Sequence, residues 1–156
     1  MAKPQSVWLM RHGEAEWQAP SDRERHLTPL GRQQAESVGQ QIQAYLQGPT
    51  HVWVSPYQRA QQTCELLIKA AAIDVVHRET SDLITPDKAP EVAVELIEAS
   101  EFQQLVLVCH MPIVAHLQKL LSGQPCQSFR TAQMAQLTRM PNESLWQLQN
   151  TWFAQS

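Results

Sequence analysis

Two short segments in which every residue is apolar constrain the fold of this chain more than any other feature. Residues 7–10 read Val-Trp-Leu-Met and residues 105–109 read Leu-Val-Leu-Val-Cys, and the two runs end at Arg11 and His110. A strand without polar positions is buried on both faces, which is typical of the interior of a parallel sheet covered by helices. The chain is therefore predicted to belong to the α/β class.

The segments between these runs carry helix signals that support this prediction. Thr28 can cap a helix whose first turn holds Pro29, and apolar residues recur at helical spacing as far as Leu46. The other predicted elements are strands over 51–55 and 74–76, helices that begin at Pro56, Glu91 and Pro112, a polar loop from Arg78 to Pro90, and an antiparallel hairpin over 132–140 and 144–153. This alternation predicts a three-layer α/β/α fold with a mostly parallel central sheet and an antiparallel hairpin at its edge.

Composition limits the kind of protein further. With 156 residues, 43% of them hydrophobic, the chain has the size and apolar content of one ordinary domain, and we expect residues 1–156 to form it. A formal net charge of -3 argues against recognition of nucleic acid or an anionic membrane through bulk positive charge. Cys64, Cys109 and Cys126 lack C-x-x-C spacing, so neither a disulfide framework nor a zinc site is expected. We find no signal peptide or membrane-spanning run and expect a monomeric, cytoplasmic protein.

Basic side chains and histidines gather where the predicted strands end. The first strand ends at Arg11 and His12, the second at Ser55 with Arg59 one helical turn later, and the fourth at His110. Because the carboxyl ends of parallel strands meet at one edge of a sheet, these residues are expected to converge there. The planar fork of arginine matches phosphate oxygens in pairs and stays charged at every relevant pH. The sequence therefore predicts a phosphate pocket at this edge.

Three motifs at these strand ends carry a family resemblance. The runs L-M-R-H-G-E from residue 9, S-P-Y-Q-R-A-Q-Q-T from residue 55 and V-C-H-M-P from residue 108 resemble, in this order, the motifs of the histidine phosphatase superfamily, also called the phosphoglycerate mutase-like fold. The chain is most similar to the short, lidless SixA-type phosphohistidine phosphatases, as are the runs at Ser21-Asp22, Leu27-Thr28 and 129–131.

The resemblance implies a role for each residue of the pocket. His12 would be the nucleophile that takes the phosphoryl group, Arg11, Arg59 and His110 would hold the phosphate, and Gly13 and Ser55 would line the substrate site; no metal ion or cofactor is expected. Electrostatics agrees, because two nearby arginines lower the pKa of a histidine and keep its lone pair available for attack. Their charges also stabilise the transferring phosphoryl group.

Segment lengths bear on the leaving group. Larger superfamily members carry a proton donor on inserted segments, but here only residues 77–104 separate the third and fourth strands, which leaves little room for a lid. Phosphohistidine needs little protonation of its leaving group, since the leaving imidazole has a pKa of about 6.5. Asp22 is the candidate acid, and Asp87 and Glu79 are weaker candidates.

The leading hypothesis is a phosphohistidine phosphatase that acts on a histidine-phosphorylated protein, such as a phosphotransfer domain or phosphocarrier, through a phospho-His12 intermediate. The run from Arg11 to Gln18 also resembles R-H-G-E-T-x-x-N of small-molecule members, with Ala15 and Gln18 as departures, so a small-ester phosphatase remains an alternative. A non-catalytic phosphohistidine-binding module is the alternative from another class. Trp17 either packs or lines the pocket mouth, and Arg25 is a solvated charge unless it lies at the rim.

Overall fold

The computed structural model describes residues 3–155, which build one six-stranded sheet. The strand order is β3-β2-β4-β1-β5-β6. The strands are β1 (Gln5–Arg11), β2 (Pro49–Val54), β3 (Asp74–Thr80), β4 (Gln104–Cys109), β5 (Met134–Arg139) and β6 (Gln147–Trp152). The strands β1, β2, β3 and β4 are parallel to one another. β5 and β6 are antiparallel to their neighbours and β6 forms an edge, so the predicted hairpin is confirmed.

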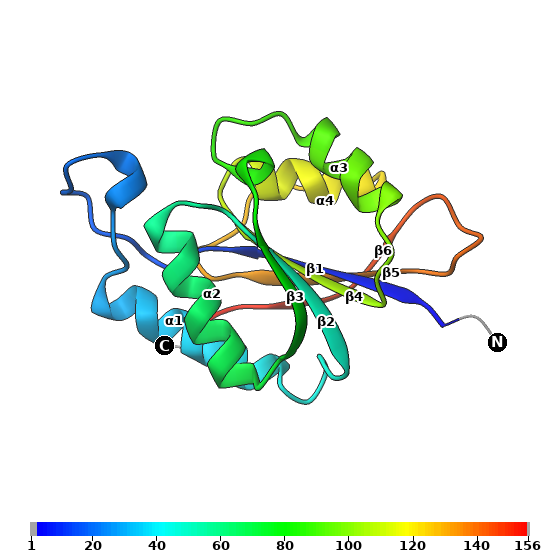
Figure 1. Ribbon diagram of the computed structural model, residues 1–156, viewed down its shortest axis with the longest axis horizontal. Coiled ribbons are helices and arrows are strands. Elements are labelled where there is room, and N and C mark those ends of the chain that lie inside the picture. The colour runs from blue at the N-terminus through cyan, green and yellow to red at the C-terminus, as the bar shows by residue number, and fades with distance from the viewer. Residues whose placement is uncertain (1–2, 156) are drawn as a thin grey trace.

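Helices cover both faces of this sheet (Figure 1). They are α1 (Pro29–Ile42), α2 (Gln58–Ala71), α3 (Pro90–Ala99) and α4 (Ile113–Ser122), with short 3-10 helices η1 (Asp22–Glu24) and η2 (Asp82–Ile84). Figure 1 shows α3 and α4 on one face and α1 and α2 on the other, which confirms the three-layer α/β/α prediction. Among the described residues, no helix combines the length and hydrophobicity that a membrane crossing requires.

The central strands β1 and β4 are apolar from residue 7 to 10 and from residue 105 to 109, because both of their faces pack against helices. Every residue of β4 is buried, as is β1 from its second to its sixth residue. Along β1, Val7 and Leu9 join the core under α3 and α4, while Trp8 and Met10 join the core under α1 and α2. Side chains that alternate between two buried layers favour apolar residues, and the buried polar ones, Ser6 and Gln104, lie at the amino ends of the two strands.

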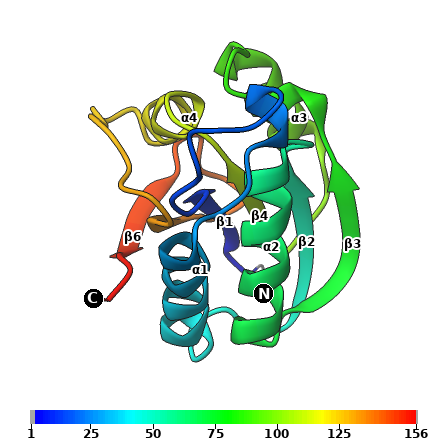
Figure 2. The same ribbon diagram turned by 90° about the vertical axis from the view of Figure 1, so that its left-hand side faces the viewer.

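The carboxyl ends of β1, β2 and β4 lie together at one end of the sheet, toward the viewer in Figure 2. The parallel register pairs Arg11 with Cys109, so the residues that follow them, His12 and His110, emerge side by side. Ser55 follows β2 at the same edge, where its amide bonds the Val108 carbonyl at 3.1 Å. The sheet thus brings the three motif-bearing strand ends together.

The third strand is longer than the sequence predicts. β3 continues to Thr80, through residues predicted to begin a polar loop at Arg78. Six of its seven residues are exposed because β3 is the other edge of the sheet. An edge strand tolerates polar side chains, so the polarity of this segment signals its position in the sheet and not a loop.

Helix boundaries also differ from the predictions: α3 and α4 begin one residue away from the predicted starts, at Pro90 and Ile113, and α1 and α2 differ by more. α1 ends at Ile42, and Tyr45 and Leu46 lie in a turn whose amides both bond the Ile42 carbonyl. α2 begins at Gln58 and not at Pro56, because the hydroxyl of Ser55 accepts from the Tyr57 amide and bonds His110 instead of capping a helix at Pro56.

A close backbone contact fixes the loop that follows β1. A Cβ atom at Gly13 would lie 2.5 Å from the Gly31 carbonyl oxygen, and a Cβ at Gly31 would overlap the carbonyl oxygen of Glu14. The predicted cap is confirmed, since the Thr28 hydroxyl accepts from the Gly31 amide at 2.9 Å. Two glycines therefore let the start of α1 pack directly on the first motif.

Candidate active site

Three side chains form the centre of the site at the carboxyl edge of the sheet. His12 follows β1, Arg59 lies in the first turn of α2, and His110 follows β4. They are only 8%, 4% and 1% exposed, so solvent screens their interactions weakly. The rings of His12 and His110 meet edge to face with their centres 5.1 Å apart.

The hydrogen bonds of His12 determine its tautomer. Nδ1 lies 2.7 Å from the Gly13 carbonyl oxygen, which can only accept, so Nδ1 carries the proton. Nε2 lies 3.2 Å from Nε of Arg59, which can only donate, so Nε2 carries the lone pair. The nitrogen that faces Arg59 is therefore the nucleophilic one.

The environment keeps His12 neutral. Burial lowers its pKa most, the hydrogen bond to Gly13 opposes this in part, and the charges of Arg59 and Arg11 lower the pKa further, to about 3. A lowered pKa of His12 is also predicted from the sequence, on the basis of the two arginines. In the structure burial makes the largest contribution. At neutral pH the ring is unprotonated at Nε2 and able to attack an electrophile.

Backbone contacts hold His12 in place. Its amide donates to the Cys109 carbonyl at 3.0 Å, and its carbonyl accepts from the Ala132 amide at 2.9 Å. The Gly13 amide donates to Oγ1 of Thr63 at 3.0 Å, so this amide is engaged. The predicted role of Gly13 in substrate binding stays a prediction, and the contact that the structure shows is between the Gly13 carbonyl and the His12 ring. Thr63, the last residue of the second motif, was not assigned a role from sequence.

Ser55 orients His110. The Ser55 Oγ lies 2.7 Å from His110 Nε2 and accepts from the Tyr57 amide at 3.3 Å. Among residues 3–155 the hydroxyl proton meets no other acceptor, so it points to Nε2 and leaves the ring proton on Nδ1. Burial lowers the pKa of His110 most, and Coulombic interactions with the His12 site and with the charges of Arg59 and Arg11 lower it further, to about 2. His110 is therefore neutral and offers Nδ1–H as a donor.

Two buried donors at the site have no partner within the described chain. They are Nδ1 of His110 and Nε of Arg11. Arg11 is anchored through its Nη1, which donates to the Phe129 carbonyl at 2.8 Å. Because buried donors are almost always paired in folded proteins, these two unpaired ones are available to hold the oxygens of an anion beside His12.

Asp22 occupies the outer side of Arg59. Nη1 of Arg59 donates to the Asp22 backbone carbonyl at 2.7 Å, and Nη2 lies 3.2 Å from the Asp22 carboxylate. The other carboxylate oxygen pairs with Arg25 at 3.0 Å. Partial burial raises the pKa of Asp22, but hydrogen bonds and charges from Arg25 and Arg59 outweigh it, so the pKa is below its ordinary value. An ionised carboxylate has no proton to give, which argues against Asp22 as the acid.

The weaker acid candidates do not contact the site. The Asp87 carboxylate accepts from the Thr85 hydroxyl, and Glu79 lies against His77 on the edge strand. Trp17 and Arg25, by contrast, lie at the rim: the guanidinium of Arg25 is 4.9 Å from the centre of the indole ring. No sequence motif marks Arg25, because its role depends on the path of the loop between β1 and α1.

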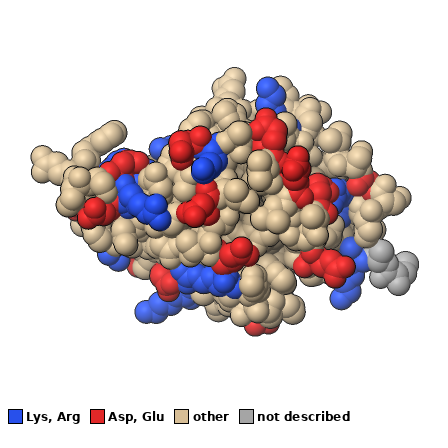
Figure 3. All heavy atoms as spheres, turned by 45° about the horizontal axis from the view of Figure 1, so that its top comes forward, with Lys and Arg blue, Asp and Glu red and all other residues tan. Residues whose placement is uncertain are grey.

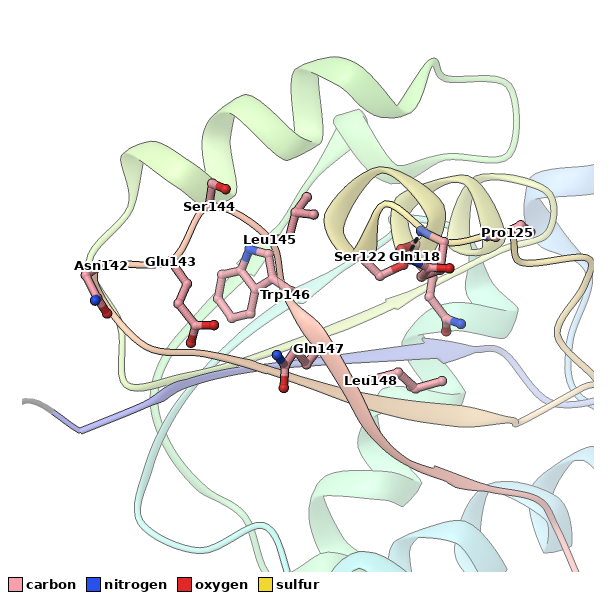
Figure 4. A pocket seen from close by; sticks show the side chains of 11 residues that line it. Gln118, Ser122, Pro125, Asn142, Glu143, Ser144, Leu145, Trp146, Gln147 and Leu148 are labelled. Atoms are coloured by element: carbon pink, nitrogen blue, oxygen red, sulfur yellow. Dashed lines mark hydrogen bonds between the residues drawn. The ribbon is translucent and has the colours of Figure 1, made fainter.

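A hollow of about 830 Å³ lies far from this site (Figure 4). It is bounded by the C-terminal turn of α4 and by the hairpin after β5, including Gln118, Leu145 and Trp146. β5 ends at Arg139, which pairs with Gln5 at the start of β1, whereas His12 follows the end of β1. This hollow contains none of the convergent residues, so its size does not make it the site.

Charge and metal-ligand groupings do not point to another site. In the view of Figure 3, basic and acidic side chains are interspersed over a mostly uncharged surface. Within residues 3–155, no group of three His, Cys, Asp or Glu side chains is arranged to hold a metal ion. The paired histidines His51 and His77 on β2 and β3, whose ring centres are 5.6 Å apart, lack a third ligand of this kind.

Comparison with known proteins agrees with the motifs. Residues 7–82 match the model of the histidine phosphatase superfamily (branch 1). The phosphohistidine phosphatase SixA homolog of Haemophilus influenzae is 32% identical over 149 residues, which cover 89% of this chain and 91% of that protein. Phosphohistidine phosphatase SixA of Escherichia coli is 28% identical over 85% of this chain and 84% of its own. A solved structure of the protein histidine phosphatase SixA with tungstate has the same fold, with a TM-score of 0.84 and 23% identity over 96% of this chain and 97% of that one.

Proposed function

Because the chain belongs to the histidine phosphatase superfamily and is an enzyme of that class, we propose that it dephosphorylates a histidine-phosphorylated protein. The reaction proceeds through a phospho-His12 intermediate. The observation that carries this proposal is the tautomer of His12, whose Nε2 lone pair faces Arg59 while Nδ1–H is bonded to Gly13. The similarity of this chain to two SixA proteins, both named as phosphohistidine phosphatases, supports phosphohistidine as the substrate.

In the first step, Nε2 of His12 attacks the phosphorus of the substrate and the N–P bond to the substrate imidazole breaks. The substrate ring, protonated on its other nitrogen, leaves as neutral imidazole with the electron pair of the broken bond. Nδ1 of His12 already carries a proton, held by the Gly13 carbonyl at 2.7 Å. The phosphorylated His12 ring is therefore formed in the protonated state, and the step needs no proton from the protein.

In the second step, water attacks phospho-His12. The N–P bond breaks, His12 returns to its neutral form and dihydrogen phosphate is released, so charge and protons balance. The Gly13 carbonyl serves this step as well, because a phosphoimidazole protonated at its other nitrogen has neutral imidazole as its leaving group. A site without a protonated acid is therefore sufficient to cleave an N–P bond. A phosphate ester, by contrast, must expel an alkoxide.

The remaining side chains hold and neutralise the phosphoryl group. Nε of Arg11 and Nδ1 of His110 are the unpaired buried donors, and they bind two of the phosphoryl oxygens in this scheme. Arg59 lies beside Nε2 of His12 and adds a further positive charge. Phosphoryl transfer depends mainly on such positioning and charge neutralisation.

We further propose that the protein works in the cytoplasm as a monomer and a single domain, with a phosphotransfer domain or phosphocarrier as partner. Cys64, Cys109 and Cys126 are all unpaired, which suits a reducing compartment. Burial raises the pKa of Cys64 and of Cys109 to about 12, so neither is a competing nucleophile.

The proposal is tested with a phosphotransfer domain phosphorylated on histidine. The wild type is expected to release phosphate and to carry acid-labile phosphate after rapid quenching, and His12→Ala is expected to do neither. His116→Ala, which replaces an exposed histidine of α4, is the matched control and should behave as the wild type. Full turnover by His12→Ala would disprove the intermediate, and hydrolysis of small esters without activity on phosphohistidine would favour the small-molecule alternative. Binding without phosphate release would favour the non-catalytic module.

A further inference from the structure

A tryptophan projects into solvent at the rim of the site. Trp17 is 88% exposed, more than any of the other large hydrophobic residues that lie exposed in residues 3–155. An indole has a large apolar surface and one hydrogen-bond donor, and such side chains are enriched where one protein binds another. We propose that Trp17 and the hollow beside it form the docking surface for the protein that carries the phosphohistidine, a role that rests on the proposed function.

The indole packs against an arginine that is itself anchored to the loop. The Arg25 guanidinium packs 4.9 Å from the ring centre, donates from Nε to the Glu16 carbonyl at 2.6 Å, and pairs through Nη1 with Asp22 at 3.0 Å. A side chain that is already ordered loses little conformational entropy on binding. The contact with Arg25 thus lowers part of the conformational entropy that the exposed indole would lose when a partner binds.

The hollow beside Trp17 adjoins the catalytic residues. It has a volume of about 290 Å³ and is lined by Trp17, Ala19, Ser21, Asp22 and Arg25. Asp22 also accepts from Arg59, which donates to His12, so one residue separates the hollow from the arginine of the site. A protein whose phosphohistidine reaches His12 must therefore cover this hollow as well.

The side chains of this surface indicate which side chains the partner presents to it. The indole and Ala19 offer apolar contact, which an aliphatic side chain close to the phosphohistidine would match. Glu14, Glu16 and Glu24 are exposed on the same loop. Basic side chains around the aliphatic one would complement these carboxylates. The fit is to a folded protein, which has further side chains to place on the indole and over the hollow beside it.

The test compares two substrates of the same bond type. Trp17→Ala is expected to lower kcat/KM by on the order of 10- to 100-fold for a phosphotransfer domain phosphorylated on histidine, as loss of an interface anchor does. For free phosphohistidine, kcat/KM should stay within about 2-fold of the wild type, since the amino acid brings no protein surface to place on the indole. Trp17→Phe keeps an aromatic ring over Arg25 and should retain most of the activity on the protein substrate. Leu145→Ala, which removes a 52% exposed apolar side chain at the far end of the sheet, is the control and should change neither rate.

The outcomes separate docking from other roles. Equal losses on both substrates would mean that Trp17 acts through Arg25 and Asp22 on Arg59, and would overturn the docking role. An unchanged rate on the protein substrate would overturn it too. If the wild type turns over free phosphohistidine, the proposed chemistry is supported regardless of the kinetics of Trp17→Ala. If the wild type turns over neither substrate, the proposed function itself fails and the docking role with it.

Discussion

Arg59 donates its Nε–H to Nε2 of His12 across 3.2 Å, so the lone pair of the proposed nucleophile is held by the residue that we propose neutralises the phosphoryl group. The same guanidinium bonds Asp22 through both of its terminal nitrogens. When phosphorus approaches Nε2, Arg59 must release this lone pair and turn its N–H groups toward phosphoryl oxygens. Arg59 therefore exchanges partners during the reaction, which a single point charge cannot do in the same geometry.

Replacing Arg59 by lysine tests this fork geometry. Arg59→Lys keeps the positive charge but loses the Nε–H beside His12, and we expect kcat/KM on phosphohistidine to fall on the order of 10- to 100-fold, as for loss of a charge-assisted hydrogen bond. Arg78→Lys, on the edge strand where Arg78 pairs with Glu65, is the control and should retain full activity. Steady-state kinetics of both variants measures the difference, and full activity of Arg59→Lys would show that charge alone is sufficient.

The Asp22 carboxylate competes with a bound anion for Arg59. Asp22→Asn removes this negative charge while leaving the backbone carbonyl that holds Nη1 in place. Since the carboxylate is largely exposed and therefore screened, we expect orthovanadate to bind about 3- to 10-fold more tightly. Titration calorimetry checks this. Glu24→Gln, in the same 3-10 helix but bonded to Ser21, should leave the affinity unchanged, and weaker binding to Asp22→Asn would mean that Asp22 mainly positions Arg59.

The convergence of the strand ends could be predicted from sequence because it depends only on parallel pairing. Short apolar runs identified β1 and β4, and the residues after them had to meet at one edge. The tautomer of His110 could not be predicted in this way. It depends on a 2.7 Å contact with Ser55, a residue whose position before Pro56 suggests a helix cap.

The position of the Asp22 carboxylate was beyond sequence analysis for a similar reason. The sequence places Asp22 near the first motif, and proximity alone suggests a proton donor. Its ionisation depends on Arg25, three residues later, and on Arg59, which the chain brings from α2. Neither contact follows from spacing, because both depend on the course of an irregular loop.

The packing of α1 on the first motif predicts a distant effect on activity. Gly31→Ala would place a Cβ against the Glu14 carbonyl and push the loop after His12 away, so we expect a loss of stability of about 1–3 kcal/mol and a clear fall in kcat. In Gly39→Ala a Cβ would lie 2.6 Å from the Ala70 side chain, between α1 and α2. This control should lose stability by a similar amount but keep kcat. Urea unfolding and kinetics on the folded variants separate the two effects, and an unchanged kcat in Gly31→Ala would refute the link.

Buried neutral histidines make stability depend on pH in a direction that can be worked out. The ordinary pKa of histidine is about 6.5 in the unfolded chain, and in the folded protein it is lowered to about 3 for His12 and about 2 for His110. Between these values the unfolded chain binds protons that the folded protein does not. Stability is therefore unaffected by these groups above about pH 6.5 and is lost as the pH falls below it, by about 1.4 kcal/mol per pH unit for each histidine.

His12→Asn isolates one of these contributions. Because the carboxylates titrate alike in both proteins, the free energy of unfolding measured by urea at pH 6 and pH 4 should fall less steeply in His12→Asn than in the wild type, by about 1.4 kcal/mol per pH unit. His116→Asn changes an exposed histidine and should leave the slope as it is in the wild type. If His12→Asn and the wild type lost stability in parallel, His12 would have to be protonated in the folded protein across this range. A protonated ring has no lone pair on Nε2, so the same result would confine the proposed chemistry to pH values above about 6.5.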